Sequence, residues 1–352
     1  MKRAFVYEWK RNLLPLVIFC AVAVCISAVY TFTARLSYGQ VTGELADDSC
    51  IGVFAAILCV LCTLVPVMQF SYRMKTRSAD LWYSLPIGRK KLVLVRVLGG
   101  LVLVFVPYTL AYWLGVACVA MQETRFLFVH YLSFWALSLP LGVGLFGVCS
   151  FLFSRANTVA DGLVFLLLWA CVLPLVLLVC FSGLRFTLGW NPDLPAYLNY
   201  YSGFDVAAFF FPYSPLGYIS GIFDAIVCRS ALGVFSEFSL WFVVPLAVFE
   251  GVGAYIGLFL CADRYKAENA GQISGSWFGY RVLIPVYTVL LFGAADRLIG
   301  NEIIMYVLVA VFGAALYFAY RRSFRLKKQD IICYIVSVAA GIALALVLHY
   351  FA

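Results

Sequence analysis

The sequence predicts an all-α fold: a polytopic transmembrane helix bundle of about nine spans, with a cytoplasmic N-terminus and the C-terminus outside. Three observations predict it, namely the composition, the length of the uncharged runs and the placement of basic residues between them. Hydrophobic residues make up 64% of the 352 positions, charged residues 12%, and the mean hydropathy is +0.98. Soluble domains carry about 25% charged residues, so this composition excludes a water-soluble fold.

Runs with almost no Asp, Glu, Lys or Arg define the expected spans. Crossing about 30 Å of hydrocarbon takes a helix of about 20 residues, and most of the runs are long enough. Glu250 is the one charged residue inside them. The nine runs cover residues 12–34, 49–72, 97–122, 126–154, 162–184, 238–262, 282–295, 303–320 and 331–352.

The basic residues distinguish the two ends of these spans. With nine crossings and a cytoplasmic N-terminus, twenty of the 25 Lys and Arg residues fall on the cytoplasmic side. This imbalance follows the positive-inside rule, so the net charge of +8 reflects orientation in a membrane and not nucleic-acid binding. Without a crossing at 282–295, the basic cluster Arg321–Lys328 would lie outside. In the nine-span topology, the basic residues that lie outside are Arg35, Arg125, Arg185, Arg229 and Arg297.

The runs and their connections divide the chain into three regions. Residues 1–12 are expected to form a cytoplasmic amphipathic lead-in helix at the membrane interface. Residues 13–262 form a six-span core, with a large cytoplasmic segment at 73–91 and an outer connection at 183–239. Short helices at the outer interface are expected in that connection. Residues 263–352 add a cytoplasmic connection and three further spans.

Motifs of enzyme chemistry do not occur in the sequence. It has no Gly-x4-Gly-Lys-Ser/Thr phosphate loop, no His-Glu-x-x-His and no Gly-x-Ser-x-Gly. His130 and His349 fall near the outer ends of spans, and the C-x-x-C pair Cys59 and Cys62 is expected to consist of small packing residues. We therefore expect a chain that is not an enzyme, binds no metal or cofactor and cannot hydrolyse ATP by itself.

Glu250 is the clearest intramembrane charge, near the middle of the run 238–262. A carboxylate in hydrocarbon costs several kcal/mol unless it is paired or hydrated, so such residues often mark a transport pathway or a proton-coupling group. An equally weighted interpretation is a protonated or hydrogen-bonded packing residue. Glu250 is therefore a candidate for the translocation path.

The segment Ser78–Leu92 is too apolar for a solvated loop. Leu81, Trp82 and Leu85 fall at helical spacing, Pro86 ends the helix, and basic residues precede the next span. A cytoplasmic amphipathic helix of this kind lies on lipid or docks into a groove of a partner protein. A plain structural turn is the third possibility.

Two motifs resemble those of ABC-2-type permeases, the membrane subunits of ABC transporters in Gram-positive bacteria. The first is Asp80-Leu-Trp-Tyr-Ser-Leu-Pro-Ile-x-Arg-Lys-Lys-Leu92, similar to the family's signature after the second span. The second and weaker one is Asp263-Arg-Tyr-Lys-Ala-Glu-Asn-Ala-Gly271 after the sixth span. The basic stretch Lys2–Arg11 also matches the family's N-terminal helix. The last three spans go beyond the family's six-span core.

The resemblance implies a permease subunit in the cell (cytoplasmic) membrane. It would couple to a separate ABC ATPase subunit, which carries the ATP, and pair with a second permease chain, the same or related, for export. The outer connection would correspond to the family's re-entrant helices. The segment 73–91 would be the coupling segment. The implied ATPase contacts are Asp80, Leu81, Trp82, Tyr83, Ser84, Leu85, Pro86 and Ile87, together with Glu8 and Trp9.

Two other functions remain as alternatives. An integral-membrane enzyme acting on lipid-linked substrates would need acids, histidines or metal ligands that converge at one depth. A proton-coupled secondary transporter would use Glu250, and replacing Glu250 by Gln would then abolish coupled transport. The transported substrate cannot be inferred from the sequence.

Overall fold

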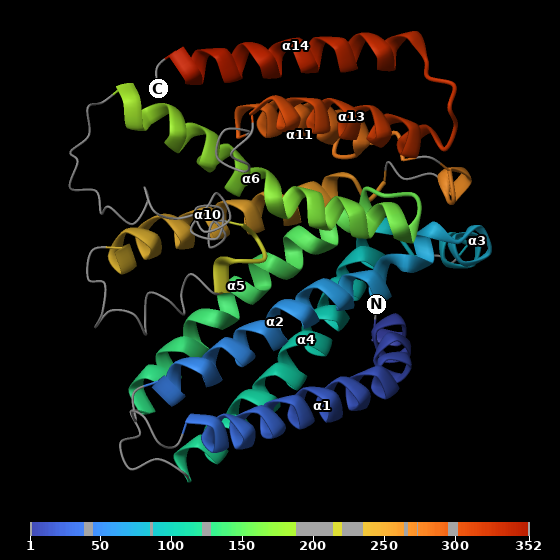
Figure 1. The fold of residues 1–352 in the computed structure, drawn as a ribbon. Helices are drawn as coiled ribbons and strands as arrows, with labels where there is room; N and C mark the ends of the chain where they lie inside the picture. The colour runs from blue at the N-terminus through green and yellow to red at the C-terminus, as the bar shows by residue number, and fades with distance from the viewer. Residues whose placement is uncertain are drawn as a thin grey trace. The chain divides into compact units, whose positions relative to one another are not determined.

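The computed structural model describes residues 2–38, 45–84, 87–121, 128–187, 214–219, 235–263, 267–272, 274–294 and 302–350. All regular secondary structure within these ranges is helical (Figure 1). Most of the predicted outer connection 183–239 lies outside the described residues, so its short helices stay a prediction.

The chain forms two compact units, which are described separately. The first comprises Met1–Ser154 and Pro215–Gly271, and the second comprises Arg155–Ser214 and Gln272–Ala352. The helices of the first unit are α1 (Lys2–Tyr38), α2 (Leu45–Phe70), η1 (Ser71–Met74), α3 (Thr76–Tyr83), α4 (Arg89–Ala120), α5 (Phe128–Ser154), α10 (Phe235–Leu260) and η4 (Ala267–Asn269). Those of the second are α6 (Val159–Thr187), α11 (Tyr280–Gly293), α13 (Glu302–Arg321) and α14 (Lys328–Tyr350). Helix α6, placed by the sequence within the six-span core, thus groups with the C-terminal helices.

Among the described residues, eight helices are long and apolar enough to cross a membrane, which supports the prediction of a multi-pass membrane protein. Their apolar stretches are Val6–Thr33, Gly52–Met74, Arg89–Ala120, Tyr131–Ser154, Val159–Cys180, Val243–Leu260, Ile304–Arg321 and Lys328–Leu348. The ninth predicted run, 282–295, is helix α11. Its 14 residues extend about 21 Å at about 1.5 Å per residue, which is less than the hydrocarbon thickness. A ninth crossing therefore stays a prediction.

In the first unit, α1 packs along α4, α2 packs against α4 and α5, and α10 packs against α5 (Figure 1). Glycines allow the closest of these approaches. A Cβ atom added to Gly251 of α10 would lie 2.8 Å from the Gly144 Cα of α5. Packing through small residues is typical of membrane helices, where backbones approach closely to gain dispersion contacts. Gly253, which belongs to a Gly-x-x-x-Gly pattern in the sequence, instead faces open space.

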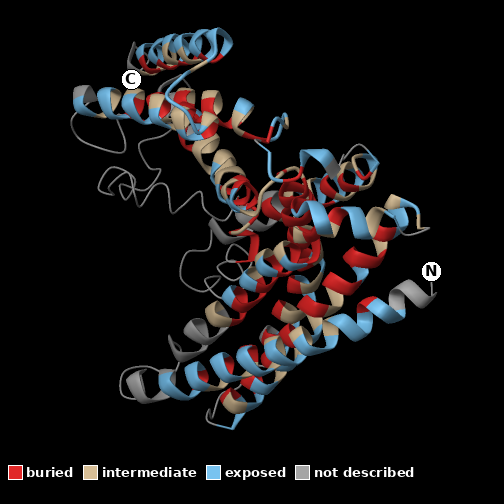
Figure 2. Ribbon diagram, turned by 90° about the vertical axis from the view of Figure 1, so that its right-hand side faces the viewer, coloured by how far each residue is buried: buried red, intermediate tan, exposed pale blue. Residues whose placement is uncertain are grey.

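Aromatic side chains fill the interior between α2, α4 and α5. Tyr112 donates a hydrogen bond of 2.6 Å to the Tyr131 carbonyl oxygen, and its ring lies 4.7 Å from that of Phe54. Tyr108 and Ser138 share a hydrogen bond of 2.8 Å. Each of these buried hydroxyls thus has a partner, as an apolar interior demands. Figure 2 shows buried residues on the sides of helices that face other helices, and exposed residues on their outer sides.

In the second unit, α11 packs against α6, α13 and α14. One end of α6 is held by Asp161, whose carboxylate accepts hydrogen bonds from Ser274 Oγ at 2.9 Å and Tyr280 Oη at 3.0 Å. Between α13 and α14, Arg321 binds both carboxylate oxygens of Asp330, at 2.6 and 2.7 Å. Two-point Arg–carboxylate contacts of this kind fix geometry as well as charge.

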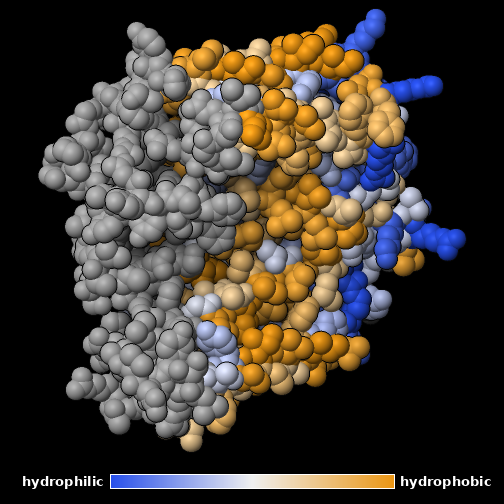
Figure 3. Space-filling model, in the orientation of Figure 1, coloured by the Kyte–Doolittle hydropathy of each residue, from blue (hydrophilic) through white to orange (hydrophobic). Residues whose placement is uncertain are grey.

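The outer flanks of the helices are apolar. In α1, for example, Leu14 is 71% exposed, and in α14 Leu346 is 64% exposed. Contiguous apolar flanks on long helices are expected where lipid, and not water, is the solvent. On the face shown in Figure 3, strongly hydrophilic residues lie in the region of α3 and near the connection between α13 and α14.

Candidate functional site

Helix α3 lies between two membrane-length helices on very short connections. Helix η1 follows α2 directly, Lys75 alone separates η1 from α3, and α4 starts at Arg89. Backbone hydrogen bonds continue across both ends of α3, from Ala79 N to the Lys75 carbonyl oxygen at 2.9 Å and from Ser84 N to the Asp80 carbonyl oxygen at 3.0 Å. Such short links leave an eight-residue helix little freedom to move independently of α2 and α4.

The inner side of α3 packs on the unit. Ala79 is fully buried, and the Trp82 ring lies 6.0 Å from that of Tyr72 in an edge-on arrangement. The guanidinium carbon of Arg96, from α4, lies 4.3 Å from the centre of the Trp82 ring and 4.5 Å from that of Tyr72. Stacked cation–aromatic contacts of this kind are strongest when removed from water.

The outer side of α3 is open. Asp80 and Ser84 are exposed, and Leu81 is 66% exposed despite its apolar side chain. One face of α3 is thus packed on the unit and the other is exposed. The exposed face carries several of the residues that the family resemblance assigns to ATPase contact. Leu85 and Pro86 lie outside the described residues. Ile87 is half-buried.

A buried ion pair joins the start of α1 to this cluster. Glu8 Oε1 lies 3.2 Å from Arg96 Nη2, and the two side chains are 3% and 1% exposed. Glu8 Oε2 also binds Arg11 Nη2 at 2.8 Å. Because a buried charge without its counterion is very costly, Glu8 and Arg96 must stay together. We name the set Glu8, Arg11, Tyr72, Trp82 and Arg96 the arginine cluster.

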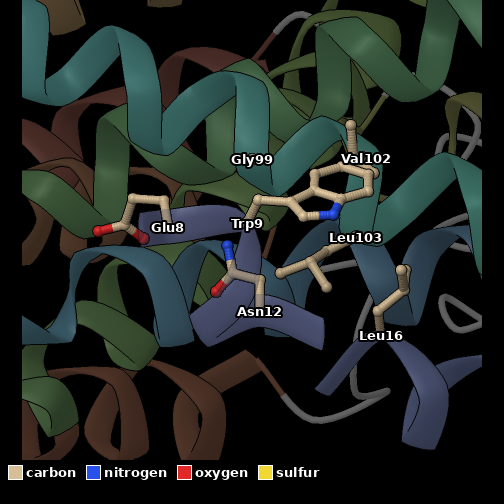
Figure 4. Close-up of a pocket in the computed structure, with 7 residues that line it drawn as sticks. All are labelled: Glu8, Trp9, Asn12, Leu16, Gly99, Val102 and Leu103. Atoms are coloured by element: carbon tan, nitrogen blue, oxygen red, sulfur yellow. The ribbon is translucent and has the colours of Figure 1, made fainter. Parts of the chain in front are cut away.

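Trp9 lies on a different side of α1 from Glu8. Figure 4 shows its ring beside Val102, while the Glu8 carboxylate points away and Asn12 extends toward Gly99. The small pocket drawn there holds only about 10 Å³, less than a ligand needs. Trp9 is 43% exposed. The contact of Glu8 and Trp9 with an ATPase stays a prediction. Glu8 is buried and already pairs with Arg96 inside the chain.

The two sequence motifs meet at the beginning of α4. Arg89 donates from Nη1 to the Asp263 carbonyl oxygen at 3.1 Å and lies 4.7 Å from the centre of the Tyr83 ring. Lys90 Nζ lies 3.4 Å from Asp263 Oδ2. Helix η4, in the second motif, packs against α3. Arg89 and Lys90, which follow Pro86, therefore bind within the chain, and their place at the lipid headgroups stays a prediction.

Comparison with protein-family models, with curated proteins and with solved structures gives no match.

Glu250 makes one strong contact inside the first unit. The Tyr218 hydroxyl donates to Glu250 Oε2 at 2.5 Å, and Tyr218 is 1% exposed. Burial, followed by the nearby Glu250, raises the pKa of the Tyr218 phenol well above its ordinary value, so the phenol stays protonated and remains a donor. The Leu216 carbonyl oxygen accepts a weak hydrogen bond from Cys59 Sγ at 3.6 Å, which ties this segment to α2. The place of Glu250 in a translocation path stays a prediction.

The described residues contain no group of three or more His, Cys, Asp or Glu side chains that could hold a metal ion. Some of the residues that the sequence singled out lie in contact networks within the chain. Trp82 and Glu8 meet in the arginine cluster, and Glu250 pairs with Tyr218. The sequence analysis did not single out Arg96 or Tyr72, which connect the first two.

Proposed function

We propose that this chain is the membrane-spanning permease subunit of an ATP-driven ABC exporter in the cell membrane. It would cross nine times, with the N-terminus inside and the C-terminus outside. A separate ATPase subunit would bind its cytoplasmic face, and a second permease chain would complete the path. The motif Asp80–Leu92 and the concentration of basic residues on one side of the spans support this proposal.

The two-faced environment of α3 is the observation that carries the proposal. A partner that moves on ATP binding needs a contact that is exposed on one side and firmly attached on the other. Helix α3 offers Asp80, Leu81 and Ser84 outward and fixes Trp82 on Arg96 inward. An exposed leucine beside polar residues also fits a helix-in-groove contact with a protein.

The arginine cluster supplies the path for the motion. A push on the outer face of α3 would act through Trp82 on Arg96 in α4 and, through the ion pair, on Glu8 in α1. Well-packed, paired groups transmit displacement because they deform little. The start of α1 and the beginning of α4 would therefore move with α3, and both helices continue as membrane-length helices.

The test compares an outward substitution on α3 with a matched exposed position. Leu81→Asp adds a charge to the proposed contact but leaves Trp82 in place. Phe324→Asp makes the same kind of change at a residue that is 90% exposed and lies between α13 and α14. Tagged proteins are purified in mild detergent with the products of neighbouring genes co-expressed, and the eluates are assayed for ATPase activity.

We expect wild type and Phe324→Asp to bring down an ATPase and Leu81→Asp to lose it by about tenfold or more, as for a central contact residue. Light scattering of the wild-type complex gives the number of permease chains. Full ATPase activity with Leu81→Asp would remove α3 as the docking element. A folded wild-type protein that never carries an ATPase would overturn the permease proposal itself.

A further inference from the structure

A second, larger cavity lies beside the arginine cluster, between α1, α2, η1, α3 and α4. Its volume is about 280 Å³, close to the lower end of the range for ligand pockets, about 300 to 1,000 Å³. All its lining residues belong to the first unit. Unlike the small pocket of Figure 4, it has room for a small polar group with part of an apolar tail.

The lining of this cavity carries an excess of positive charge. Arg11, Lys75 and Arg96 contribute three cationic side chains, and no Asp or Glu is among the described residues that line it. Glu8, which pairs with Arg11 and Arg96, lines the small pocket of Figure 4 and not this cavity. One carboxylate cannot neutralise three cations, so the cavity keeps a net positive charge that an anion could neutralise.

Arg96, which lines the cavity, is also incompletely satisfied. Its Nε has no hydrogen-bond acceptor among the described residues, although the side chain is 1% exposed. The bonds from Nη1 to Gln69, to the backbone oxygen at 3.4 Å and to Oε1 at 3.5 Å, are at the long limit. A guanidinium has five N–H donors, and an unmade hydrogen bond from a buried charged group is costly. An anionic oxygen in the cavity would supply what is missing.

The lining also contains neutral polar and apolar residues. Ser71 and Ser78 add hydroxyl groups, and Pro15 of α1 and Met68 of α2 add apolar side chains. Met68 is 44% exposed and belongs to an apolar membrane-length stretch. Along the chain, Pro15 and Met68 lie nearer the middle of the apolar stretches of α1 and α2 than Arg11 and Lys75 do, which matches the order in which a phospholipid presents its chains and headgroup.

We infer that this cavity binds a phosphate-bearing anion, with Arg11, Lys75 and Arg96 holding the phosphate. The phosphate belongs either to the headgroup of an anionic phospholipid, whose chain follows Pro15 and Met68, or to a soluble phosphate ester. This inference does not depend on the ATPase partner. A bound anion would contact the cavity that Trp82 lines and so help to fix the position of α3.

The experiment removes two charges inside the cavity and, in a control, two charges beside it. The double substitution Arg11→Gln and Lys75→Gln targets the cavity. The matched pair Lys10→Gln and Arg77→Gln alters neighbouring exposed residues that do not line it. Delipidated full-length protein in detergent is titrated with phosphatidylglycerol, phosphatidylcholine or glycerol 3-phosphate, and binding is measured by native mass spectrometry.

We expect wild type and the control pair to bind phosphatidylglycerol in preference to phosphatidylcholine. In the cavity pair, affinity for phosphatidylglycerol should fall by about tenfold or more through the lost charge-assisted bonds. Binding of glycerol 3-phosphate with the same dependence on Arg11 and Lys75, without selective binding of phosphatidylglycerol, would support the cavity with a soluble ligand. Equal losses in both pairs would reduce the effect to surface charge and overturn the inference. So would failure of wild type to bind any anionic probe.

A second variant keeps the inference testable if the cavity pair does not fold. Ser78→Leu leaves every charge in place and puts a larger side chain into the cavity from α3. Its binding of the anionic probe that wild type prefers should fall as in the cavity pair. Unchanged affinity in a folded Ser78→Leu protein would contradict binding at this place.

Discussion

At the residue scale, Arg96 is held by a combination of contacts that no single partner could provide. Glu8 neutralises its charge, while Trp82 and Tyr72 lie against its guanidinium plane. Lysine could replace the charge but not the planar stacking. The side chain therefore makes the lead-in part of α1, helix η1 and helix α3 depend on one position in α4.

Breaking the ion pair from one side should cost more than breaking it from both. Glu8→Gln leaves the buried Arg96 charge without its closest counterion, and loss of one partner of a buried pair typically costs about 3–5 kcal/mol. Adding Arg96→Gln to Glu8→Gln should restore part of that loss. Thermal unfolding of the purified variants in detergent measures both.

Arg11→Gln is the control for these Glu8 and Arg96 variants, because Arg11 is the more exposed of the two partners of Glu8. The Arg11 side chain is 34% exposed, and exposed ion pairs contribute about 0–1 kcal/mol to stability. If the Glu8→Gln protein unfolds at the same temperature as Arg11→Gln, the buried pair does not carry the stability assigned to it here.

At the scale of elements, the contact between α5 and α10 depends on glycines that the Gly-x-x-x-Gly pattern identifies only in part, since Gly257 packs on Phe151 but Gly253 does not. Gly251 and Gly253 are two residues apart in one helix, yet only Gly251 meets the backbone of α5. A helix of period 3.6 turns successive positions about 100° apart, so a difference of two residues reverses the face. Alanine substitutions at Gly251 and Gly253 can therefore be compared directly, because they differ only in what the added methyl group meets.

Gly251→Ala should weaken the packing of α10 on α5, because the added Cβ would lie 2.8 Å from the Gly144 Cα. Overpacking of this kind costs about 1–3 kcal/mol. Gly253→Ala adds the same methyl group where nothing lies within 4 Å and should leave stability unchanged or slightly higher. The melting temperatures of the two variants measure the difference, and equal values would contradict the close approach.

The elements themselves were accessible from the sequence, and the contacts between them were not. Uncharged runs located the long helices because hydrocarbon tolerates few charges. The segment with Leu81 and Trp82 was expected to be an amphipathic helix, and α3 is one. Which side faces inward depends on Arg96, counted in the sequence only as one more basic residue. Its partner Glu8 is distant in the chain, and no local pattern links the two.

At the scale of the whole molecule, the number of crossings depends on the short helix α11. Nine crossings put the basic connection between α13 and α14 inside and the C-terminus outside, whereas eight reverse both. That connection carries Arg322, Arg325 and Lys327. Positive charge near short loops strongly favours the cytoplasmic side, so α11 should cross despite its length, aided by tilt or local thinning of the bilayer.

Two tagged variants, one with the tag inserted after Ser323 and the other with the tag appended after Ala352, separate the two topologies. We expect the first tag to be protected from a membrane-impermeant label in intact cells and the second to be labelled. The reverse result would show that α11 does not cross, and it would place the positive cluster outside. Permeabilised cells, in which both tags must react, provide the control.

The division into two units also sets the order in which the protein can be completed during synthesis. The first unit takes its last helix, α10, from a stretch made after α6, which belongs to the second. Until α10, which ends at Leu260, has been synthesised, the glycine-lined side of α5 has no helix packed on it. The insertion machinery or the surrounding lipid must therefore accommodate α5 with that side uncovered while α6 is being made.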